Sequence, residues 1–371
     1  MSLQPKSPSH SVSGHFPPVI KKSHFWNRLR QRVSMLYHYL LGHYRLHKML
    51  YGFALSQALY VTAKLGVADH LSQGSKTCEE LAASLSVNVN GLCHLMRLLS
   101  KTGIVSVDKK GHYKLTALGS RLRSDMPNSL RGTVLSIAEI YPAWGNLLYS
   151  LQTGKVGFDK TFQMGLYDYL SQNAEANTHF NQCMEETTRE WIIPSLALCD
   201  LSNIKTVVDV GGNTGMLTTM ILKKYPHLET ILYDQAHVVN EAEKILEAAQ
   251  VANRCQVIGG DFFESIPAGG DLYIISRVLL NWDDVHALQI LKNCHAAMGP
   301  SAKLLIMDFV LPNQGASAYE LISSLQILIL SGSRLMRTEE EYYDMLFKAG
   351  FHAPHLIKTG GMISFIEAAV E

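Results

Sequence analysis

Apolar runs separated by polar and glycine-containing stretches recur through the second half of the chain and predict strands that alternate with helices. Strands are predicted for the run that begins at Thr206 and for residues 230–234, 255–258, 271–278, 303–308 and 362–368. Helices are predicted after Met216, after Asp283 and over residues 339–348. This alternation is typical of an α/β sheet, in which ligands bind at the carboxyl ends of the strands.

Residues 52–125 have a different pattern, which predicts a small winged-helix unit. Thr77 and Glu80 have the spacing of a capping box at the start of one helix, and residues 91–99 supply a second. The two strands of the wing are predicted at residues 104–107 and 112–115. DNA binding by this architecture requires a basic helix face, yet leucine and methionine dominate the second helix.

Residues 1–50 hold eight lysines and arginines and no aspartate or glutamate. The first two dozen residues are rich in serine, proline and histidine, which predicts disorder. A basic amphipathic helix is predicted over residues 25–50. Three interpretations remain open: docking in a dimer interface, weak contact with an anionic membrane surface, or targeting to an organelle.

Composition fits an enzyme of two domains. The chain has 371 residues, is 47% hydrophobic and carries a net charge of +1, which argues against a dedicated nucleic-acid surface. Its six cysteines form no C-x-x-C pair, so neither a metal site nor a disulfide framework is indicated. Because no apolar run is long enough for a membrane span and no signal-peptide core is visible, we expect a cytoplasmic protein.

A glycine-rich loop follows the first predicted strand of the sheet. Gly211, Gly212 and Gly215 come directly after Asp209 and before a helical pattern. Glycines permit positive φ and close approach of a ligand to the free N–H groups of the next helix. The spacing leaves a dinucleotide and S-adenosylmethionine both open, with Asn213 at the middle glycine position of the latter pattern.

The next two strands end in acids suited to a nucleoside. Asp234 ends its strand about twenty residues after the glycines, where a carboxylate can accept from both ribose hydroxyls. Asp261 and Phe262 follow the third strand. Asp261 can accept from an exocyclic amine while Phe262 stacks on the adenine ring, although an aromatic at such a position also commonly packs in the core.

Together, the motifs D-V-G-G-N-T-G, Y-D, G-G-D-F-F and R-V-L-L-N-W-D-D resemble those of the small-molecule O-methyltransferases of the caffeate and acetylserotonin type and their bacterial relatives. The resemblance extends from Gly52 to the C-terminus. It implies a C-terminal seven-stranded Rossmann-like sheet, an N-terminal winged-helix dimerisation domain and a homodimer. It also implies S-adenosylmethionine as cofactor, bound by Asp209, Gly211, Asp234, Asp261, Phe262 and Ser276.

The resemblance also sets the expected division of the chain and the acceptor pocket. The expected segments are a basic extension (1–50), the dimerisation domain (51–125), a helical linker (126–198) and the cofactor domain (199–371). A small aromatic acceptor is expected against Phe162, Met164, Phe180, Met184 and Trp282. Aromatic and methionine side chains on helices are commonly core residues, and that interpretation stays open for the helical members of this set.

The expected catalytic base is missing. Relatives have histidine where this chain has Leu280, and leucine cannot transfer a proton. Asp308 and Met336 stand where many relatives have glutamate. Asn281 and Asp308 remain the candidate catalytic residues, and the L-L-N-W variant is similar to the anthracycline-tailoring branch.

Three functions are compatible with this sequence. The first is S-adenosylmethionine-dependent O-methylation of an aromatic or polyketide-like hydroxyl, driven by proximity instead of a base. The second is an enzyme of the same fold that holds the cofactor without transferring methyl, as hydroxylase- and pericyclase-like relatives do. The third is a winged-helix regulator.

Overall fold

The computed structural model describes residues 42–239, 242–332 and 336–370. The chain forms two compact units, 1–56 and 57–371. In the first unit, residues 42–50 are helical with exposed side chains. Most of the basic helix predicted for residues 25–50, and the segment predicted to be disordered before it, lie outside the described residues.

The winged-helix unit forms as predicted, after helix α2 (Gly52–Lys64). The capping box is present, with the Glu80 N–H donating to Thr77 Oγ1 and the Thr77 N–H to the Glu80 carboxylate. Leu92, Met96 and Leu99 are buried in the core of the unit, so most of the apolar face of the second helix is not available at the surface. The elements are α3 (Val67–Ser72), α4 (Cys78–Leu85), α5 (Val89–Lys101), β1 (Val105–Val107) and β2 (Tyr113–Leu115).

A helical segment follows, as predicted for residues 126–198. Its two longest helices, α6 and α10, pack closely at Gly132, where a Cβ atom would lie 2.4 Å from Gln182 Cβ. Glu186 accepts the backbone N–H groups of Gly132 and Thr133 at 2.9 and 2.8 Å, which satisfies free donors at the start of α6. The elements are η1 (Gly119–Leu122), α6 (Arg131–Trp144), α7 (Leu147–Thr153), α8 (Gly157–Phe162), α9 (Leu166–Gln172), α10 (Ala174–Thr187), the π-helix η2 (Thr188–Ile192), α11 (Ile193–Ser195) and η3 (Leu196–Leu198).

The sheet has seven strands among the described residues, in the order β5-β4-β3-β6-β7-β9-β8. The five neighbouring strands β5, β4, β3, β6 and β7 are parallel, and β9 is antiparallel to both β7 and β8. The strands are β3 (Thr206–Val210), β4 (Glu229–Asp234), β5 (Cys255–Gly259), β6 (Leu272–Ser276), β7 (Lys303–Phe309), β8 (His352–Ile357) and β9 (Ile363–Ala369).

Two details differ from the strand predictions. Strand β6 ends at Ser276 and not at residue 278, because Arg277 takes a left-handed conformation with φ 56°. Strand β8 was not among the predicted runs. It lies at the sheet edge, contains Pro354 and has no fully buried residue, so it lacks an apolar signature.

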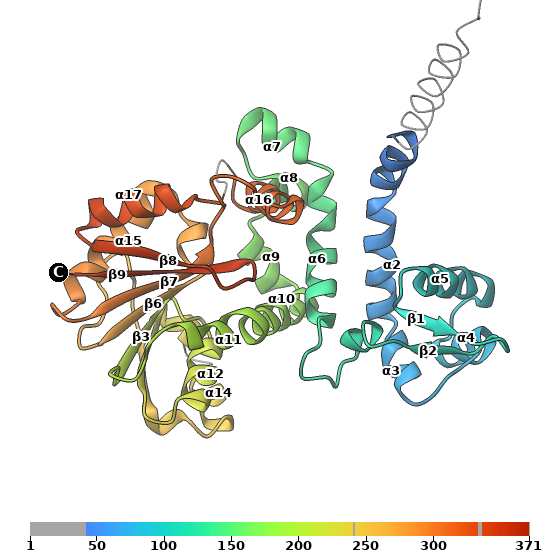
Figure 1. Cartoon of the computed structure of the whole chain (residues 1–371), viewed down its shortest axis with the longest axis horizontal. Helices are drawn as coiled ribbons and strands as arrows, with labels where there is room; N and C mark the ends of the chain where they lie inside the picture. Colours follow the sequence, from blue (N-terminus) through green and yellow to red (C-terminus); the bar gives the residue numbers. More distant parts are fainter. Residues whose placement is uncertain (1–41, 240–241, 333–335, 371) are drawn as a thin grey trace, which may run out of the picture. The chain divides into compact units, whose positions relative to one another are not determined.

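Helices cover both faces of the sheet (Figure 1). Val208 packs toward α15 and α17, whereas its neighbour Val207 packs toward α12 and α14, as alternation along a strand requires. In the described residues, no helix is long and apolar enough to cross a membrane. The remaining elements are α12 (Met216–Lys224), α13 (Ala236–Val239), α14 (Ala242–Ala248), η4 (Ala252–Arg254), η5 (Leu279–Asn281), α15 (Asp284–Ala297), α16 (Ala318–Ser331) and α17 (Glu339–Ala349).

Candidate functional site

The predicted cofactor residues meet at one edge of the sheet. Because β5, β4, β3, β6 and β7 are parallel neighbours, their carboxyl ends stand side by side in that order. Along this edge lie Asp261 and Phe262 after β5, Asp234 at the end of β4, the glycine loop after β3 and Ser276 at the end of β6. The residues predicted to bind adenine, those predicted to bind ribose and the glycine loop therefore lie in one row along this edge.

The glycine loop has the backbone that its sequence predicts. Gly211, Asn213 and Gly215 have φ values of 73°, 54° and 78°, so Asn213 is indeed left-handed. A Cβ atom on Gly211 would lie 2.7 Å from Val278 Cγ2 and 3.7 Å from Phe262 Cε1. Gly215 precedes α12 and offers no side chain as a cap, so the first N–H groups of α12 are left for a ligand.

Asp234 ties the loop to the end of β4. Its Oδ2 accepts the Asn213 N–H at 2.8 Å and its Oδ1 accepts the Gln235 N–H at 2.7 Å. The side chain is only half-buried, so it has accessible lone pairs for neutral hydroxyl donors.

Asp261 and Phe262 form the far end of the row. Asp261 is exposed and accepts the Phe263 N–H at 2.8 Å. Phe262 is half-buried, with ring centroids 4.9 Å from Phe263 and 6.0 Å from Trp282. Its edge contacts leave ring surface beside Gly211, which is consistent with stacking on a flat heterocycle.

Asp209 lies beneath the glycine loop. Its carboxylate is 1% exposed and accepts a hydrogen bond from Thr218 Oγ1 at 2.7 Å. A Cβ atom on Gly212 would lie 2.7 Å from Asp209 Oδ2, so the loop covers this carboxylate. Burial raises the pKa of Asp209 to about 6. The structure gives Asp209 a contact with Thr218, and its role in binding the cofactor stays a prediction.

The end of β6 holds two buried polar atoms without partners. Ser276 Oγ and Arg277 Nε make no hydrogen bond in the described part of the chain. Orphaned buried polar atoms are costly, and here they stand beside the glycine loop. Arg277 was part of the recognised motif but had no role assigned, because its contacts depend on a helix 93 residues away.

The turn around the missing base is held by buried polar groups. Arg337 donates to the carbonyls of Leu279 and Trp282, both at 2.7 Å. Asp308 Oδ2 accepts the Leu280 N–H at 3.2 Å, and its Oδ1 accepts the Phe309 N–H at 2.8 Å.

The catalytic roles of the two candidate residues stay predictions. Asp308 is fully buried, and burial raises its pKa to about 6, while its carboxylate accepts the Leu280 N–H of the turn. Asn281 is exposed, and its amide donates to the Arg277 carbonyl at 3.2 Å. Arg337 was missed because only the tertiary structure brings it to the turn.

The predicted acceptor residues divide into two groups. Met184 lies against Arg277, with its Sδ 3.4 Å from Nη1, and Phe180 forms an edge contact with Tyr167 at 6.5 Å. Phe162 instead packs in the helical core against Phe158 and Tyr169, with centroids 4.4 and 4.7 Å away. The remaining two predicted residues, Met164 and Trp282, are half-buried.

His179, which could replace the missing base, is turned toward another helix. Its ring is buried, with Nδ1 3.5 Å from Glu139 Oε1 on α6 and Nε2 4.0 Å from Glu175 Oε1. In the described residues, no cluster of three or more histidine, cysteine, aspartate or glutamate side chains is arranged to hold a metal ion.

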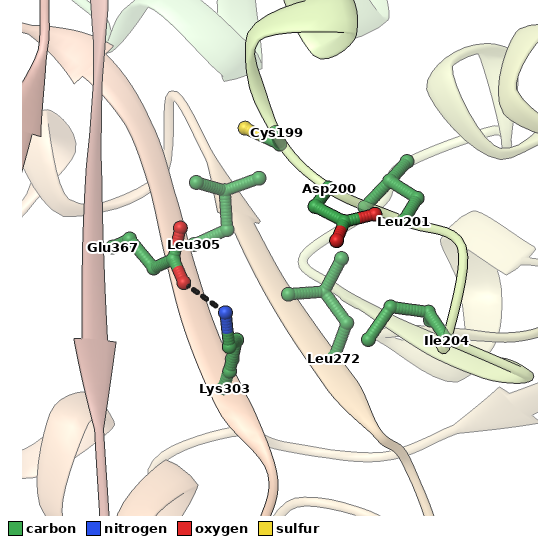
Figure 2. A pocket seen from close by; sticks show the side chains of 8 residues that line it. All are labelled: Cys199, Asp200, Leu201, Ile204, Leu272, Lys303, Leu305 and Glu367. Atoms are coloured by element: carbon green, nitrogen blue, oxygen red, sulfur yellow. Dashed lines mark hydrogen bonds and ion pairs between the residues drawn. The ribbon is translucent and has the colours of Figure 1, made fainter.

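A small hollow lies at the opposite edge of the sheet (Figure 2). Leu272 and Lys303, which line it, are the first residues of β6 and β7, and Lys303 pairs with Glu367. Ligands of open α/β sheets bind at the carboxyl ends of strands, so this hollow is separate from the candidate site.

The residues at the carboxyl edge fit S-adenosylmethionine. Asp234 provides an accessible acceptor, and Phe262 provides an aromatic ring. The glycine loop allows close approach of a ligand, and the unpaired polar atoms of Ser276 and Arg277 lie at the end of the neighbouring strand. A dinucleotide pyrophosphate is bound by loops with the pattern G-x-G-x-x-G. Counted from Gly211, this chain has Asn213 and Met216 at the second and third glycine positions, so the pattern is absent.

Comparison with known proteins agrees with this geometry. Residues 144–352 match the O-methyltransferase domain family, and residues 47–125 match the O-methyltransferase dimerisation domain. The chain is 36% identical to the phenazine O-methyltransferase PhzM of Lysobacter antibioticus over 86% of this chain and 94% of that protein.

Solved structures give the same assignment. The mitomycin 7-O-methyltransferase MmcR superposes with a TM-score of 0.81 at 28% identity, covering 90% of this chain and 99% of that one. The calicheamicin-biosynthesis methyltransferase, solved in its S-adenosylhomocysteine-bound form, gives 0.80 at 28% identity over 90% and 99%. With its sheet, its glycine loop and both family domains in place, the chain belongs to the O-methyltransferase family.

Proposed function

We propose that this protein transfers a methyl group from S-adenosylmethionine to the hydroxyl of an aromatic or polyketide-like acceptor, without a general base at position 280. The observation that carries the proposal is the row of cofactor-type residues at the carboxyl edge, ending beside a turn that presents Leu280. The family of the chain and the phenazine and mitomycin enzymes among its relatives support this reaction and acceptor class.

The cofactor, when bound, supplies a methyl group activated on a sulfonium. In this proposal Asp234 accepts from the ribose hydroxyls, while Asp261 and Phe262 hold the adenine. The loop from Gly211 to Gly215 approaches the remaining part of the ligand without side chains in the way. Each of these residues binds or orients, and none changes its covalent state.

The acceptor is placed on the other side of the same edge. Met184 and Phe180 on α10 supply apolar surface near Arg277 and Tyr167. Leu280 has no group that can take the phenol proton, so these residues act by orienting the oxygen and excluding water. Such a site favours acceptors that ionise readily in solution, because the nucleophile has to form without help from position 280.

We also propose that the protein works as a homodimer. The match to a dimerisation domain supports this assembly, and the exposed apolar side chains of Tyr44, Leu46, Met49 and Leu50 are suited to burial against another surface. Residues 1–50 are proposed to contribute to it, with a weaker contact to anionic membrane surfaces as the alternative. We expect the enzyme to act in the cytoplasm.

The decisive experiment is to incubate the full chain with S-adenosylmethionine and pooled phenols and hydroxyquinones, and to measure S-adenosylhomocysteine release. Release that depends on the acceptor supports methyl transfer. Tight cofactor binding without release at any pH, together with a chemically altered acceptor, would instead assign the protein to the group that holds the cofactor without donating methyl. A gel shift with genomic fragments tests the regulator interpretation.

A further inference from the structure

Arg277 is held in an uncommon backbone conformation at the cofactor edge. Its φ of 56° places a non-glycine residue in the left-handed region. Its N–H donates to the Met307 carbonyl at 2.9 Å, and its carbonyl accepts from the Asn281 amide at 3.2 Å. A strained residue fixed from both sides is a feature typical of functional sites.

The guanidinium of Arg277 reaches from the sheet to helix α10. Nη2 donates to Thr188 Oγ1 at 2.7 Å, and Nη1 donates to the Met184 carbonyl at 3.3 Å. Nε is buried and has no partner among the described residues. The side chain therefore has one end engaged by the acceptor helix and one donor left unused beside the cofactor row.

Thr188 is the receiving residue and stands at a break in the helix. It is 1% exposed, and its hydroxyl donates to the Met184 carbonyl at 2.8 Å while it accepts from Arg277. It begins the π-helix Thr188–Ile192, which separates α10 from the segment that leads into β3. Single-turn π-helices occur frequently at functional sites, and the hydroxyl at the start of this one contacts both Arg277 and Met184.

We propose that the Arg277–Thr188 contact couples occupancy of the cofactor site to the position of helix α10, and through it to the acceptor surface formed by Phe180 and Met184. This inference rests on the proposed function of the site. A ligand that fixes Arg277 from the sheet side restricts the guanidinium, and the hydrogen bond to Thr188 then restricts the start of the π-helix. Because coupling is reciprocal, the acceptor strengthens cofactor binding by the same factor.

A matched pair of threonines allows a sharp test. Thr187 and Thr188 each donate to the carbonyl four residues earlier, at 2.7 and 2.8 Å, but Arg277 contacts only Thr188 among the two. Thr188→Val therefore removes the short hydrogen bond between Arg277 and Thr188 and leaves the longer one to the Met184 carbonyl. Thr187→Val removes a comparable local bond, and Thr188→Ser restores the hydroxyl. Hydrogen exchange of residues 174–187 is measured with and without saturating S-adenosylhomocysteine, whose affinity is measured separately by calorimetry.

In the wild type, in Thr187→Val and in Thr188→Ser, we expect the ligand to slow exchange in α10 by about tenfold. In Thr188→Val we expect this protection to be lost, while the Kd for S-adenosylhomocysteine changes by less than about threefold. The KM for the acceptor should rise in the same variant more than the KM for S-adenosylmethionine.

Equal protection of α10 in Thr188→Val and the wild type would overturn the coupling and leave the proposed function intact. Absence of protection in a wild type that binds S-adenosylhomocysteine would do the same. A wild type that fails to bind S-adenosylhomocysteine would overturn the proposed function itself. If Thr188→Val is too unstable to measure, Thr188→Ser and Thr188→Ala are compared instead, and indistinguishable protection in the two also overturns the proposal.

Discussion

The backbone N–H of Leu280 donates a hydrogen bond to the buried carboxylate of Asp308 at 3.2 Å. The turn at the expected base position is thus fixed through its backbone, and Arg337 holds the carbonyls on either side. These hydrogen bonds use backbone groups of the turn and do not involve the side chain at position 280. The loss of a base at this position therefore leaves the rest of the site in place.

The first prediction concerns the pH dependence of methyl transfer. With Leu280 in place, the rate should rise with pH toward the pKa of the acceptor phenol and show no limb near the imidazole value of about 6.5. Leu280→His should add a limb in that region and raise the rate at neutral pH by about tenfold or more, because a positioned base contributes catalysis. Initial rates of S-adenosylhomocysteine release from pH 5 to 10 give both profiles.

A wild-type limb near neutral pH that disappears in His179→Gln would reveal a substitute base and contradict the proximity mechanism. A Leu280→His profile that is identical to the wild type would mean that the acceptor oxygen does not lie beside position 280. Both variants are checked for unchanged S-adenosylhomocysteine affinity, so that a folding or cofactor defect is recognised.

The second prediction concerns cofactor affinity. Asp234→Ala should weaken S-adenosylhomocysteine binding by about 1–3 kcal/mol, since it removes an acceptor for the ribose and the contact to the Asn213 N–H. Asp261→Ala should have an effect of similar size at the adenine end. Asp200→Ala is the control, because that exposed carboxylate accepts from Ser202 at the opposite edge. Titration calorimetry that finds unchanged affinity in both site variants would rule out the proposed cofactor row.

The third prediction concerns the turn that Arg337 holds. Arg337→Met should lower the free energy of unfolding by about 3 kcal/mol, because two buried carbonyls lose their donor. Asp284→Ala should cost less than about 1 kcal/mol, since it removes only the exposed ion pair with Arg337. Urea denaturation of the three proteins gives these values, and equal losses in the two variants would contradict the assignment.

The fourth prediction follows from the buried Asp209. Burial raises its pKa from 3.8 to about 6, so between these values the folded state binds more protons than the unfolded state. This carboxyl group therefore makes the free energy of unfolding fall as pH rises from about 4 to about 6. Asp209→Asn removes the effect, and the variant should gain stability relative to the wild type by about 3 kcal/mol over that range. Urea denaturation at a series of pH values tests it, and a difference that is constant with pH would refute it.

The fifth prediction concerns assembly. Removing residues 1–50 should shift the protein from dimer to monomer or aggregate, because apolar surface of the partner becomes exposed. Sedimentation analysis of the full and shortened chains measures this change. A shortened chain that stays dimeric but no longer sediments with anionic vesicles would favour the membrane-contact interpretation of this segment.

The sequence by itself determined the α/β alternation, the glycine loop with Asn213 at its middle position and the acids that follow the strands. These features are local: buried strands appear as apolar runs, and a turn needs glycine or asparagine at positive φ. Strand β8 escaped this reasoning because an exposed edge strand with a proline carries no apolar pattern. The capping box at Thr77 was likewise readable, since both of its partners lie within three residues.

The tertiary structure alone decided which side chains face the site. The sequence predicts Asp209 as a cofactor-binding residue, and the tertiary structure adds that the glycine loop covers its carboxylate, which accepts a hydrogen bond from Thr218. Arg277 contacts Met184 and Arg337 contacts Leu279 across 93 and 58 residues of chain, distances at which no local pattern operates. Their roles arise when parallel strands bring remote segments to one edge, because packing and the satisfaction of buried polar groups are properties of the whole fold.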